Sequence, residues 1–385
     1  MKLDEYLAAK PLYYEKIDYD RFPRIYNQIK EYFRLPKIIH VVGTNAKGST
    51  GRALAHLLHA KGLSVGHYSS PHIINFNERI WLNGQDSSNK TLEIAHLKLQ
   101  KILNIESAES LSYFEYTTLL AMLIFCEVCD YIVLEAGLGG EFDATNVFAK
   151  NLSIVTPVGY DHQLFLGNSI EEIATTKLRS VNNDMVLAKQ HEAVLYELAY
   201  NRIDEVKRNL YLAQSYLPDD FYHEITEFVK DEKLAPFFKD NLATAFCAYQ
   251  LLGFELDIKL LSGLIFFGRC YKITSNITID VGHNPMAASA LLEHFKDKKV
   301  ILIYNSYNDK EYERILSILK PIILEVQIIK LSNNRAVEES VLINSLDLLD
   351  IKHSNFIAIE QNLEYLVFGS FSVVETFLKE NSSEK

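Results

Sequence analysis

The feature that most constrains the fold of this chain is the stretch 38–50, where the apolar run IIHVV gives way to the turn GTNAKGST and then to the helix-forming run ALAHLLHA. A buried strand that stops at a glycine and restarts as a helix points backbone N–H groups and a helix N-terminus at one place, which suits a phosphate. In this interpretation Gly43 lets the chain turn, Lys47 reaches the terminal phosphates and Gly48 keeps the backbone close. The other candidates for nucleotide contact in this turn are Asn45, Ala46, Ser49 and Thr50.

The spacing of this turn differs from that of the usual P-loop. Gly43 lies only four residues before Lys47, and Ala46 stands where a glycine is expected. The alternative is therefore an ordinary strand-to-helix turn that contains glycine.

Composition narrows the class of protein. A chain of 385 residues with 48% hydrophobic content is long enough for two or three domains of roughly 150 residues, each with its own core. The net charge of −11 is spread along the chain without a basic block, which argues against a nucleic-acid partner. The first ten residues lack an apolar signal core, and no window holds the ~18 apolar residues of a membrane span. We therefore expect a cytoplasmic protein without a membrane partner.

Two further strands end in polar side chains. The run YIVLE at 131–135 places Glu135 at the end of a buried strand, next to the glycine-rich turn AGLGGEFDATN, and in a nucleotide site such a carboxylate usually holds Mg²⁺. The strand LSIVTPV leads into GYDH, so Asp161 and His162 arrive at the same edge, and His162 is a candidate for a metal or substrate role. The alternatives are a strand-end acid in water and a structural histidine.

The loop after the strand at 63–68 is rich in Ser, Pro, His and Asn, and loops at this position in parallel sheets often carry chemistry. Ser70 and Arg79 are its candidates, against a reading as ordinary turn residues. The run NSIEEIATTKLRSV then predicts a helix that contains Lys177.

Strands alternate with helices over 38–188, and the alternation begins afresh after Arg269. This pattern predicts an α/β protein with two domains, 1–267 and 268–385, each a mostly parallel sheet with helices on its faces. We assign no chemistry to residues 190–235.

Taken in order, the strings resemble one family: folylpolyglutamate synthase and dihydrofolate synthase, a branch of the Mur-type ATP-dependent ligases. The matching text is GTNAKGST, YSSPHIINFNERI, SYFEYTT, LEAGLGGEFDATN, GYDH, IATTK, the asparagine of DNLATA, FGR and IDVGHNP. The resemblance implies a P-loop domain that binds ATP, followed by a smaller Rossmann-like domain.

The activity that the resemblance implies is an ATP-dependent amide ligase. A carboxylate of dihydropteroate or a reduced folate takes the γ-phosphate of ATP, and the amino group of L-glutamate attacks the acyl phosphate. Lys47 would neutralise the phosphoryl group, and Ser70 and Glu135 would bind Mg²⁺. His162 would hold a second Mg²⁺ together with Glu135.

The resemblance also assigns the remaining site residues. The adenosine and phosphate contacts, which would place ATP at the junction of the two domains, are Asn241, Arg269, Asp280 and His283. The residues that would contact the pterin substrate are Ser112, Phe142, Asp143, Ala144 and Arg79.

The resemblance further implies that Lys177 is carbamylated. An ordinary ammonium beside Mg²⁺ is a like charge in a partly desolvated place, whereas a carbamate is negative and offers the oxygens that a hard cation prefers. The carbamate would act as a metal ligand and could orient His162. The alternative is a solvated helix lysine, which the LRS that follows Lys177 favours.

One departure from the family concerns the phosphate turn. Ala46 replaces a glycine, which we expect to matter little, because alanine suits a helical backbone and fails only where φ is positive.

Two other functions compete with the folate ligase. A cell-wall Mur ligase carries a nucleotide-sugar domain ahead of the phosphate turn, and only 42 residues precede Gly43. A catalytically silent ATP-binding regulatory module would keep the turn without turnover. We expect a monomer whose partners are small molecules.

Overall fold

The computed structural model describes residues 1–11 and 18–381, and the chain divides into two compact units. The first unit comprises Met1–Val158, Leu164–Glu224 and Asp240–Leu264; the second comprises Gly159–Gln163, Ile225–Lys239 and Ile265–Lys385. The main crossing after Leu264 lies in the connection where the sequence predicts a boundary at 267. The two short segments that join the second unit earlier in the chain were not expected.

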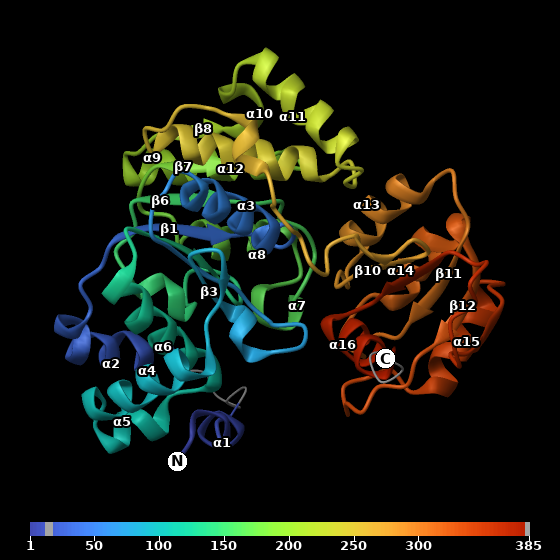
Figure 1. Cartoon of the computed structure of the whole chain (residues 1–385), viewed down its shortest axis with the longest axis horizontal. Coiled ribbons are helices and arrows are strands. Elements are labelled where there is room, and N and C mark those ends of the chain that lie inside the picture. Colours follow the sequence, from blue (N-terminus) through green and yellow to red (C-terminus); the bar gives the residue numbers. More distant parts are fainter. Residues whose placement is uncertain (12–17, 382–385) are drawn as a thin grey trace. The chain divides into compact units, whose positions relative to one another are not determined.

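The first unit is built on an eight-stranded sheet with the order β4-β3-β2-β5-β1-β6-β7-β8 (Figure 1). The strands from β2 to β8 in this order are parallel, and β3 and β4 add an antiparallel edge. Their bounds are β1 Lys37–Val42, β2 Val65–Tyr68, β3 Ile80–Leu82, β4 Gln85–Asp86, β5 Tyr131–Glu135, β6 Leu152–Val155, β7 Met185–Leu187 and β8 Leu210–Leu212.

Helices lie on both faces of this sheet, as expected for parallel strands. The α-helices that begin within residues 1–240 are α1 Leu3–Ala8, α2 Arg21–Ile29, α3 Lys47–Ala60, α4 Asn89–Ile102, α5 Ile105–Ser110, α6 Tyr113–Val128, α7 Gln163–Leu166, α8 Ile170–Leu178, α9 Val194–Val206, α10 Ala213–Tyr216, α11 Asp219–Asp231 and α12 Phe238–Leu251. Short 3₁₀ turns are η1 Lys30–Tyr32, η2 Phe76–Arg79, η3 Ala144–Val147 and η4 Ile258–Leu261.

The helix α3 lies directly on the sheet because Gly51 has no side chain. A Cβ at Gly51 would come within 2.7 Å of His67 Nε2 on β2 and 3.4 Å of Val133 Cγ1 on β5. The opposite face, which carries Ile38, Ile132 and Leu134, packs on the core formed with α6. The phosphate turn therefore continues into a helix held close to the strands on which the site depends.

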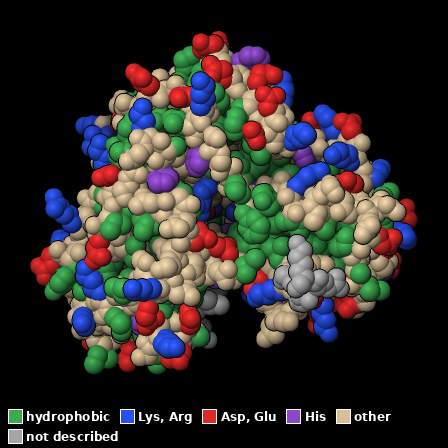
Figure 2. Space-filling view, in the orientation of Figure 1, with side chains coloured by type: hydrophobic (Ala, Val, Ile, Leu, Met, Phe, Trp, Pro, Cys, Tyr) green, Lys and Arg blue, Asp and Glu red, His purple; other side chains and the backbone are tan. Residues whose placement is uncertain are grey.

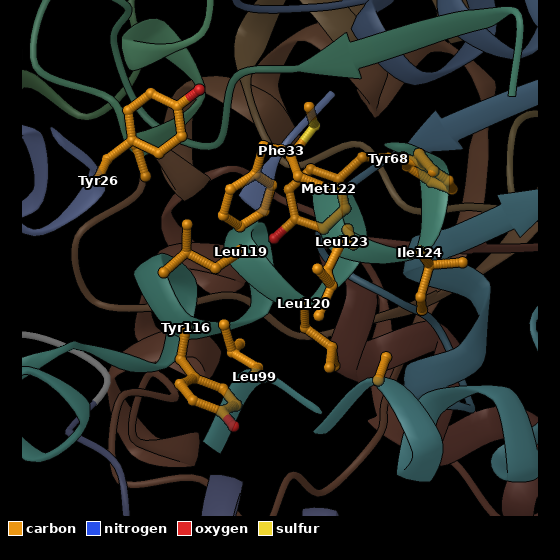
Figure 3. Packing of buried hydrophobic residues seen from close by; sticks show 14 of the residues in the cluster. Tyr26, Phe33, Tyr68, Leu99, Tyr116, Leu119, Leu120, Met122, Leu123 and Ile124 are labelled. Carbon is orange, nitrogen blue, oxygen red and sulfur yellow. The ribbon is translucent and has the colours of Figure 1, made fainter. Parts of the chain in front are cut away.

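The helix α6 is the centre of the larger core. Every residue from Tyr116 to Phe125 is buried, so the helix is covered on all sides, which explains why this stretch carries no charged residue. Figure 3 shows side chains of α6 meeting those of neighbouring elements, among them Tyr26, Phe33, Tyr68 and Leu99.

The second unit has a six-stranded sheet with the order β13-β12-β11-β14-β10-β9, parallel except for the pair β9 and β10. One face packs on α13, α14 and α15, and α16 packs on β14. The bounds are β9 Tyr271–Thr274, β10 Ile277–Asp280, α13 Pro285–Phe295, β11 Val300–Tyr304, α14 Tyr312–Leu319, η5 Lys320–Ile322, β12 Ile323–Ile328, α15 Glu339–Leu348, β13 His353–Asn355, β14 Tyr365–Phe368 and α16 Phe371–Asn381.

Both units confirm the expected fold class. On the face of the molecule in Figure 2, acidic and basic side chains are interspersed rather than separated. Within residues 1–11 and 18–381, no helix combines the length and the apolar character needed to cross a membrane.

Candidate active site

The phosphate turn is anchored to the end of β6. The backbone N–H groups of Thr44 and Asn45 donate to the Pro157 carbonyl at 2.9 and 3.1 Å. Gly43 has φ 149°, and a Cβ there would lie 1.9 Å from Thr156 Oγ1, so only glycine fits. The conformation of the turn is therefore imposed by a neighbouring strand as well as by its own sequence.

Ala46 adopts a left-handed backbone conformation. Its φ is 65° and its ψ is 0°, and it is the residue that precedes the first turn of α3. For a residue with a Cβ this conformation costs roughly 1–2 kcal/mol. The expectation that alanine finds a helical conformation here is wrong, because the turn needs a positive φ to lead into α3.

Two lysines converge on one carbonyl of the turn. Lys47 Nζ lies 3.2 Å from the carbonyl oxygens of Gly43 and Thr44, and Lys177 Nζ donates to the same Gly43 oxygen at 2.9 Å. No side chain caps the first turn of α3, and that turn holds no acidic residue. Two positive charges and the N-terminus of a helix therefore meet at one point, which attracts an anion.

Lys177 is buried, with 4% of its surface exposed, so the alternative of a solvated helix lysine is wrong. Its helix α8 begins at a capping box, in which Ser169 accepts from the Glu172 N–H and Glu172 accepts from the Ser169 N–H. A Cβ at Gly140 would lie 2.9 Å from the Lys177 carbonyl oxygen, so this glycine lets α8 approach the loop after β5.

Hydroxyl groups lie along the first turn of α3. Ser49 Oγ donates to the Ala46 carbonyl, and Asn241 Nδ2 donates to Ser49 Oγ at 3.0 Å, with both residues buried. Thr50 is 1% exposed, and among the described residues its Oγ1 has no hydrogen-bond partner. A buried hydroxyl in this state suits a ligand, because an unpaired buried polar group is costly.

The predicted metal ligands of the first unit gather at the same edge of the sheet. In the order β2-β5-β1-β6, Tyr68 pairs with Leu134 and Val41 pairs with Glu135. Glu135 is 3% exposed at the end of β5, and Ser70 follows the end of β2. A carboxylate and hydroxyl groups at this edge form the oxygen-rich donor set that a hard cation prefers.

The loop after β5 is held by Asp143, whose carboxylate lies at the start of η3. It accepts from the N–H groups of Leu138 and Thr145, at 2.8 and 2.9 Å, and from Thr145 Oγ1 at 2.6 Å. Burial raises the pKa of Asp143, although these hydrogen bonds act to lower it. The buried His40 lies 2.7 Å from Thr145 Oγ1, and burial holds the pKa of His40 well below its usual value, so its ring is neutral.

The other residues predicted to contact a pterin have different environments. Ser112 caps α6 and is nearly buried, and Ala144 is buried in η3. Phe142 is 56% exposed and its ring lies 4.2 Å from that of Tyr19. Arg79 is buried, its Nε donates to His72 Nδ1 at 2.8 Å, and its guanidinium lies over the Tyr113 ring.

The second unit holds the remaining predicted residues at the carboxyl ends of its own strands. Asp280 is buried at the end of β10, where its two oxygens accept from the N–H groups of Cys270 and Gly282 at 2.8 and 2.7 Å. Burial raises the pKa of Asp280 against the opposing charge of Arg269, whose guanidinium also lies over the Phe371 ring.

Asp161 is the centre of a charge cluster in the second unit. Its Oδ1 accepts from Lys310 Nζ at 2.6 Å and from the His162 N–H at 2.9 Å, and its Oδ2 lies 3.3 Å from His283 Nε2. Burial would raise the pKa of Asp161, but the hydrogen bond to His283 and the positive charge of Lys310 hold it well below its usual value. Asp161 is therefore ionised.

Sequence reasoning missed Lys310, Thr156 and the pair of His40 and Thr145. Lys310 lies at the end of the polar run NSYNDK that follows β11, six residues beyond the strand, so it lacked the strand-end position that identified Glu135. Thr156 and Pro157 carry no local signal, since their role is only to meet the phosphate turn. Within the part of the chain that the structure describes, no group of three or more His, Cys, Asp or Glu residues is placed to hold a metal ion.

No family model matches the chain, but individual proteins do. It is 31% identical over 307 residues to the dihydrofolate synthase/folylpolyglutamate synthase of Escherichia coli K12, a match that covers 75% of this chain and 71% of that protein. It is 38% identical to the crystal structure of Helicobacter pylori folylpolyglutamate synthetase, with a TM-score of 0.78 and coverage of 99% and 98%. The bifunctional Yersinia pestis enzyme, solved with AMPPNP and Mn, shares the fold, with a TM-score of 0.82 at 23% identity and the same coverage.

Proposed function

This chain belongs to the dihydrofolate synthase/folylpolyglutamate synthase family, and we propose that it joins L-glutamate to the carboxylate of a pteroate or folate, converting ATP to ADP and phosphate. The observation that carries the proposal is Lys47 at the N-terminus of α3, whose ammonium lies 3.2 Å from the carbonyl oxygens of Gly43 and Thr44. That arrangement suits a polyphosphate. The identity of the acceptor, a pteroate or folate, is inferred from the family.

The reaction has two steps. An oxygen of the substrate carboxylate attacks the γ-phosphorus of ATP, the bond to the β,γ-bridging oxygen breaks, and ADP leaves. The amino group of glutamate, in its neutral form, then attacks the acyl carbon; phosphate leaves with the electron pair of the acyl–oxygen bond, and the amide nitrogen loses a proton. The protein's part is to position the groups and to stabilise the phosphoryl charge.

Lys47 does most of that stabilisation. Among the described residues its ammonium contacts only carbonyl oxygens of its own turn, so it can turn to a phosphate without disturbing the core. The N–H groups at the start of α3 add dipoles directed at the same place. Asn241 donates a hydrogen bond to Ser49 at the start of α3, which supports the predicted contact of Asn241 with the nucleotide.

The residues present fit Mg²⁺. Ser70 and Glu135 stand at one edge of the sheet, and the buried Thr50 hydroxyl, which has no hydrogen-bond partner among the described residues, adds a further oxygen donor. We assign Ser70 and Glu135 to the cation that accompanies ATP, and His162 to a second one. When bound, the metal ion would lower the negative charge on the β- and γ-phosphates.

Carbamylation of Lys177 is part of the proposal. The structure adds a reason to the metal argument, because the Lys177 ammonium shares a carbonyl with the Lys47 ammonium, and like charges at this separation repel. A carbamate replaces that +1 by −1. The competing role for Lys177 is a neutral or charged brace that holds Gly43 through its hydrogen bond.

The pterin-binding assignment concerns Ser112, Phe142, Asp143, Ala144 and Arg79. Its support is that the loop after β5 is rigidly held by Asp143 yet presents the exposed ring of Phe142 next to that of Tyr19. Exposed aromatic side chains on a fixed loop suit stacking on a flat heterocycle. For ATP, we assign Arg269, Asp280 and His283 from the second unit, as the resemblance implies.

The test is acceptor-dependent product formation. The purified protein is incubated with ATP, Mg²⁺, L-glutamate and either dihydropteroate or tetrahydrofolate, and products are identified by mass spectrometry. Dihydrofolate from the first acceptor shows the synthase activity, and tetrahydrofolate with added glutamate shows tail extension. The expected outcome is product with at least one acceptor, and phosphate release only when acceptor and glutamate are both present.

The left-handed Ala46 favours one competitor, the catalytically silent ATP-binding module, because strain in the phosphate turn could weaken catalysis. That module would bind ATP and form no product with either acceptor. Our expectation of a cytoplasmic monomer without nucleic-acid partners stays a prediction.

A further inference from the structure

We propose that Lys310 is a positioning residue: through its ion pair with Asp161 it holds the turn Gly159–Gln163 in the second unit and thereby sets the orientation of His162. The inference rests on the proposed function insofar as His162 serves the ligase reaction. Neither the motifs nor the family comparisons assign a role to Lys310.

The ion pair between Lys310 and Asp161 is buried. The side chains of Lys310 and Asp161 are 6% and 8% exposed, and their charged atoms lie 2.6 Å apart. A buried ion pair need not stabilise a fold relative to apolar residues, but removing one partner leaves an uncompensated charge in a dry place. Asp161 therefore depends on Lys310, together with His283 at 3.3 Å from its other oxygen, to remain where it is.

One carboxylate oxygen of Asp161 accepts from both Lys310 and His162. Asp161 Oδ1, which accepts from Lys310, also accepts from the backbone N–H of His162 at 2.9 Å. His162 has φ 53°, a left-handed conformation that a residue with a side chain adopts only when its surroundings impose it. The hydrogen bond from its N–H to Asp161 is such a constraint, so the position of the carboxylate determines where the imidazole points.

Lys310 is itself held by a neighbouring carboxylate, that of Asp309. Its Nζ also lies 3.6 Å from Asp309, which pairs with Arg335 at 3.0 Å, and the Arg335 guanidinium lies over the Tyr307 ring. Charges of alternating sign thus run from the loop after β12 to the turn that carries His162. A lysine held on two sides can locate a carboxylate more firmly than an exposed one can.

The turn is a short stretch of the chain. It belongs to the second unit although the residues on both sides of it belong to the first, so it is a segment of five residues between two crossings. Asp161 and Lys310 are 149 residues apart. One long-range ion pair is therefore well placed to control this segment.

The test uses the full-length protein with Lys310→Met and, as a matched control, Lys352→Met. Lys352 is in the same unit and also pairs with a carboxylate at 2.6 Å, but it is 75% exposed. One readout is chymotrypsin cleavage after Tyr160, which is 38% exposed; the others are kcat and the Mn²⁺ affinity of the protein with a non-hydrolysable ATP analogue. We expect Lys310→Met to speed cleavage at least tenfold, to lower kcat at least tenfold and to weaken Mn²⁺ binding, with no change for Lys352→Met.

A second variant removes the unpaired charge. In Asp161→Asn with Lys310→Met, the amide oxygen can still accept from the His162 N–H while no carboxylate is left without a partner. We expect cleavage resistance to return to within about threefold of wild type, and this double variant decides the matter if Lys310→Met alone fails to fold. A double variant as readily cleaved as Lys310→Met would show that Lys310 does not act through Asp161.

Two other results would overturn the proposal. One is Lys310→Met with wild-type cleavage and kcat; the other is faster cleavage with unchanged kcat and Mn²⁺ affinity, which would leave the turn held by Lys310 but His162 unaffected. Absence of product from the wild-type protein is a separate outcome, which defeats the proposed function while the cleavage data still test the pairing.

Discussion

Ala46 shows how one residue can hold strain in a functional turn. Its left-handed conformation is one that glycine adopts without penalty, so a glycine here would relieve the strain. The stability gained is partly offset because glycine loses more backbone entropy on folding. We predict that Ala46→Gly stabilises the protein by about 1 kcal/mol or less, and that affinity for ATP changes by no more than about tenfold, or ~1.4 kcal/mol. Chemical denaturation and calorimetric titration measure the two quantities.

Lys207 provides the control for this substitution. It has φ 53° at the end of α9, away from the phosphate turn, so Lys207→Gly should stabilise the protein in the same way without any effect on ATP. A large gain in turnover for Ala46→Gly would instead mean that the natural turn is impaired, which favours the regulatory module.

Lys47 should matter for rate and not for folding. Within residues 1–11 and 18–381 its ammonium contacts carbonyl oxygens of the turn only. Lys47→Ala therefore removes the positive charge that would face the phosphoryl group and should lower kcat about 10³-fold or more, with an unchanged melting temperature. Lys61, exposed at the other end of α3, is the control, and Lys61→Ala should be silent. Activity above about a tenth of wild type in Lys47→Ala would reject the assignment, since that loss is only ~1.4 kcal/mol.

At the scale of elements, α8 brings Lys177 to the phosphate turn, and the prediction concerns its chemical state. If it is carbamylated, Lys177→Ala should abolish activity, and acetate should partly restore it by supplying a carboxylate in the vacated space. An added CO₂ would raise the mass of the peptide by 44 Da, but the carbamate is not expected to survive acid. The measurement is therefore ¹³C NMR of protein equilibrated with ¹³CO₂.

Lys177→Met separates the two roles of this lysine. If Lys177 serves only as a brace for Gly43, both variants should lose stability, acetate should have no effect, and no carbamate carbon signal should appear. Acetate rescue of Lys177→Ala but not of the bulkier Lys177→Met would support the carbamate, because methionine fills the space that acetate needs.

The loop between η3 and β6 contains a half-buried lysine, Lys150, with a pH signature. Lys150 Nζ donates to the Ser180 carbonyl at 2.6 Å, and burial lowers the pKa of Lys150 to about 8. Between pH 8 and about 10.4 the unfolded chain keeps a proton that the folded protein has lost, so this residue makes the free energy of unfolding rise with pH there. Lys150→Met should abolish that contribution, which is at most about 3 kcal/mol.

The measurement is urea unfolding of both proteins at pH 7, 8, 9 and 10. The stability of wild type relative to Lys150→Met should increase along this series, and comparison of the two proteins cancels the titration of tyrosines and cysteines. A difference that stays constant, or that falls with pH, would contradict the prediction.

At the scale of the whole molecule, the two units are predicted to contribute to the same reaction. Asp280→Asn should weaken ATP binding at least tenfold and leave the KM for glutamate within about twofold, because the carboxylate charge faces Arg269 and the conservative change retains one acceptor for the loop. Asp347→Asn, at an exposed ion pair of the same unit, is the control. A change confined to the KM for glutamate would show that Asp280 does not serve ATP.

The strands and the polar residues at their ends could be predicted from the sequence, because a buried strand that stops at Gly43, Glu135 or Asp280 leaves a local pattern. What the sequence did not reveal depends on contacts between distant residues. The φ of Ala46 follows from anchoring of the turn on Pro157, and the role of Lys310 follows from a carboxylate far earlier in the chain. The short helix α5 leaves little trace in the sequence, because IESAES has little apolar periodicity.

The division of the second unit into three segments has a consequence for how the protein is made. The ribosome releases Asp161 long before Lys310 exists, so the early segments of the second unit are made well before the rest of that unit. Contacts of such long range also slow folding, because the entropy of closing a long loop is lost before the contact can form. A fragment starting at Ile265 would lack those segments and leave the Lys310 ammonium without Asp161. We therefore expect such a fragment to fold less well than the complete second unit.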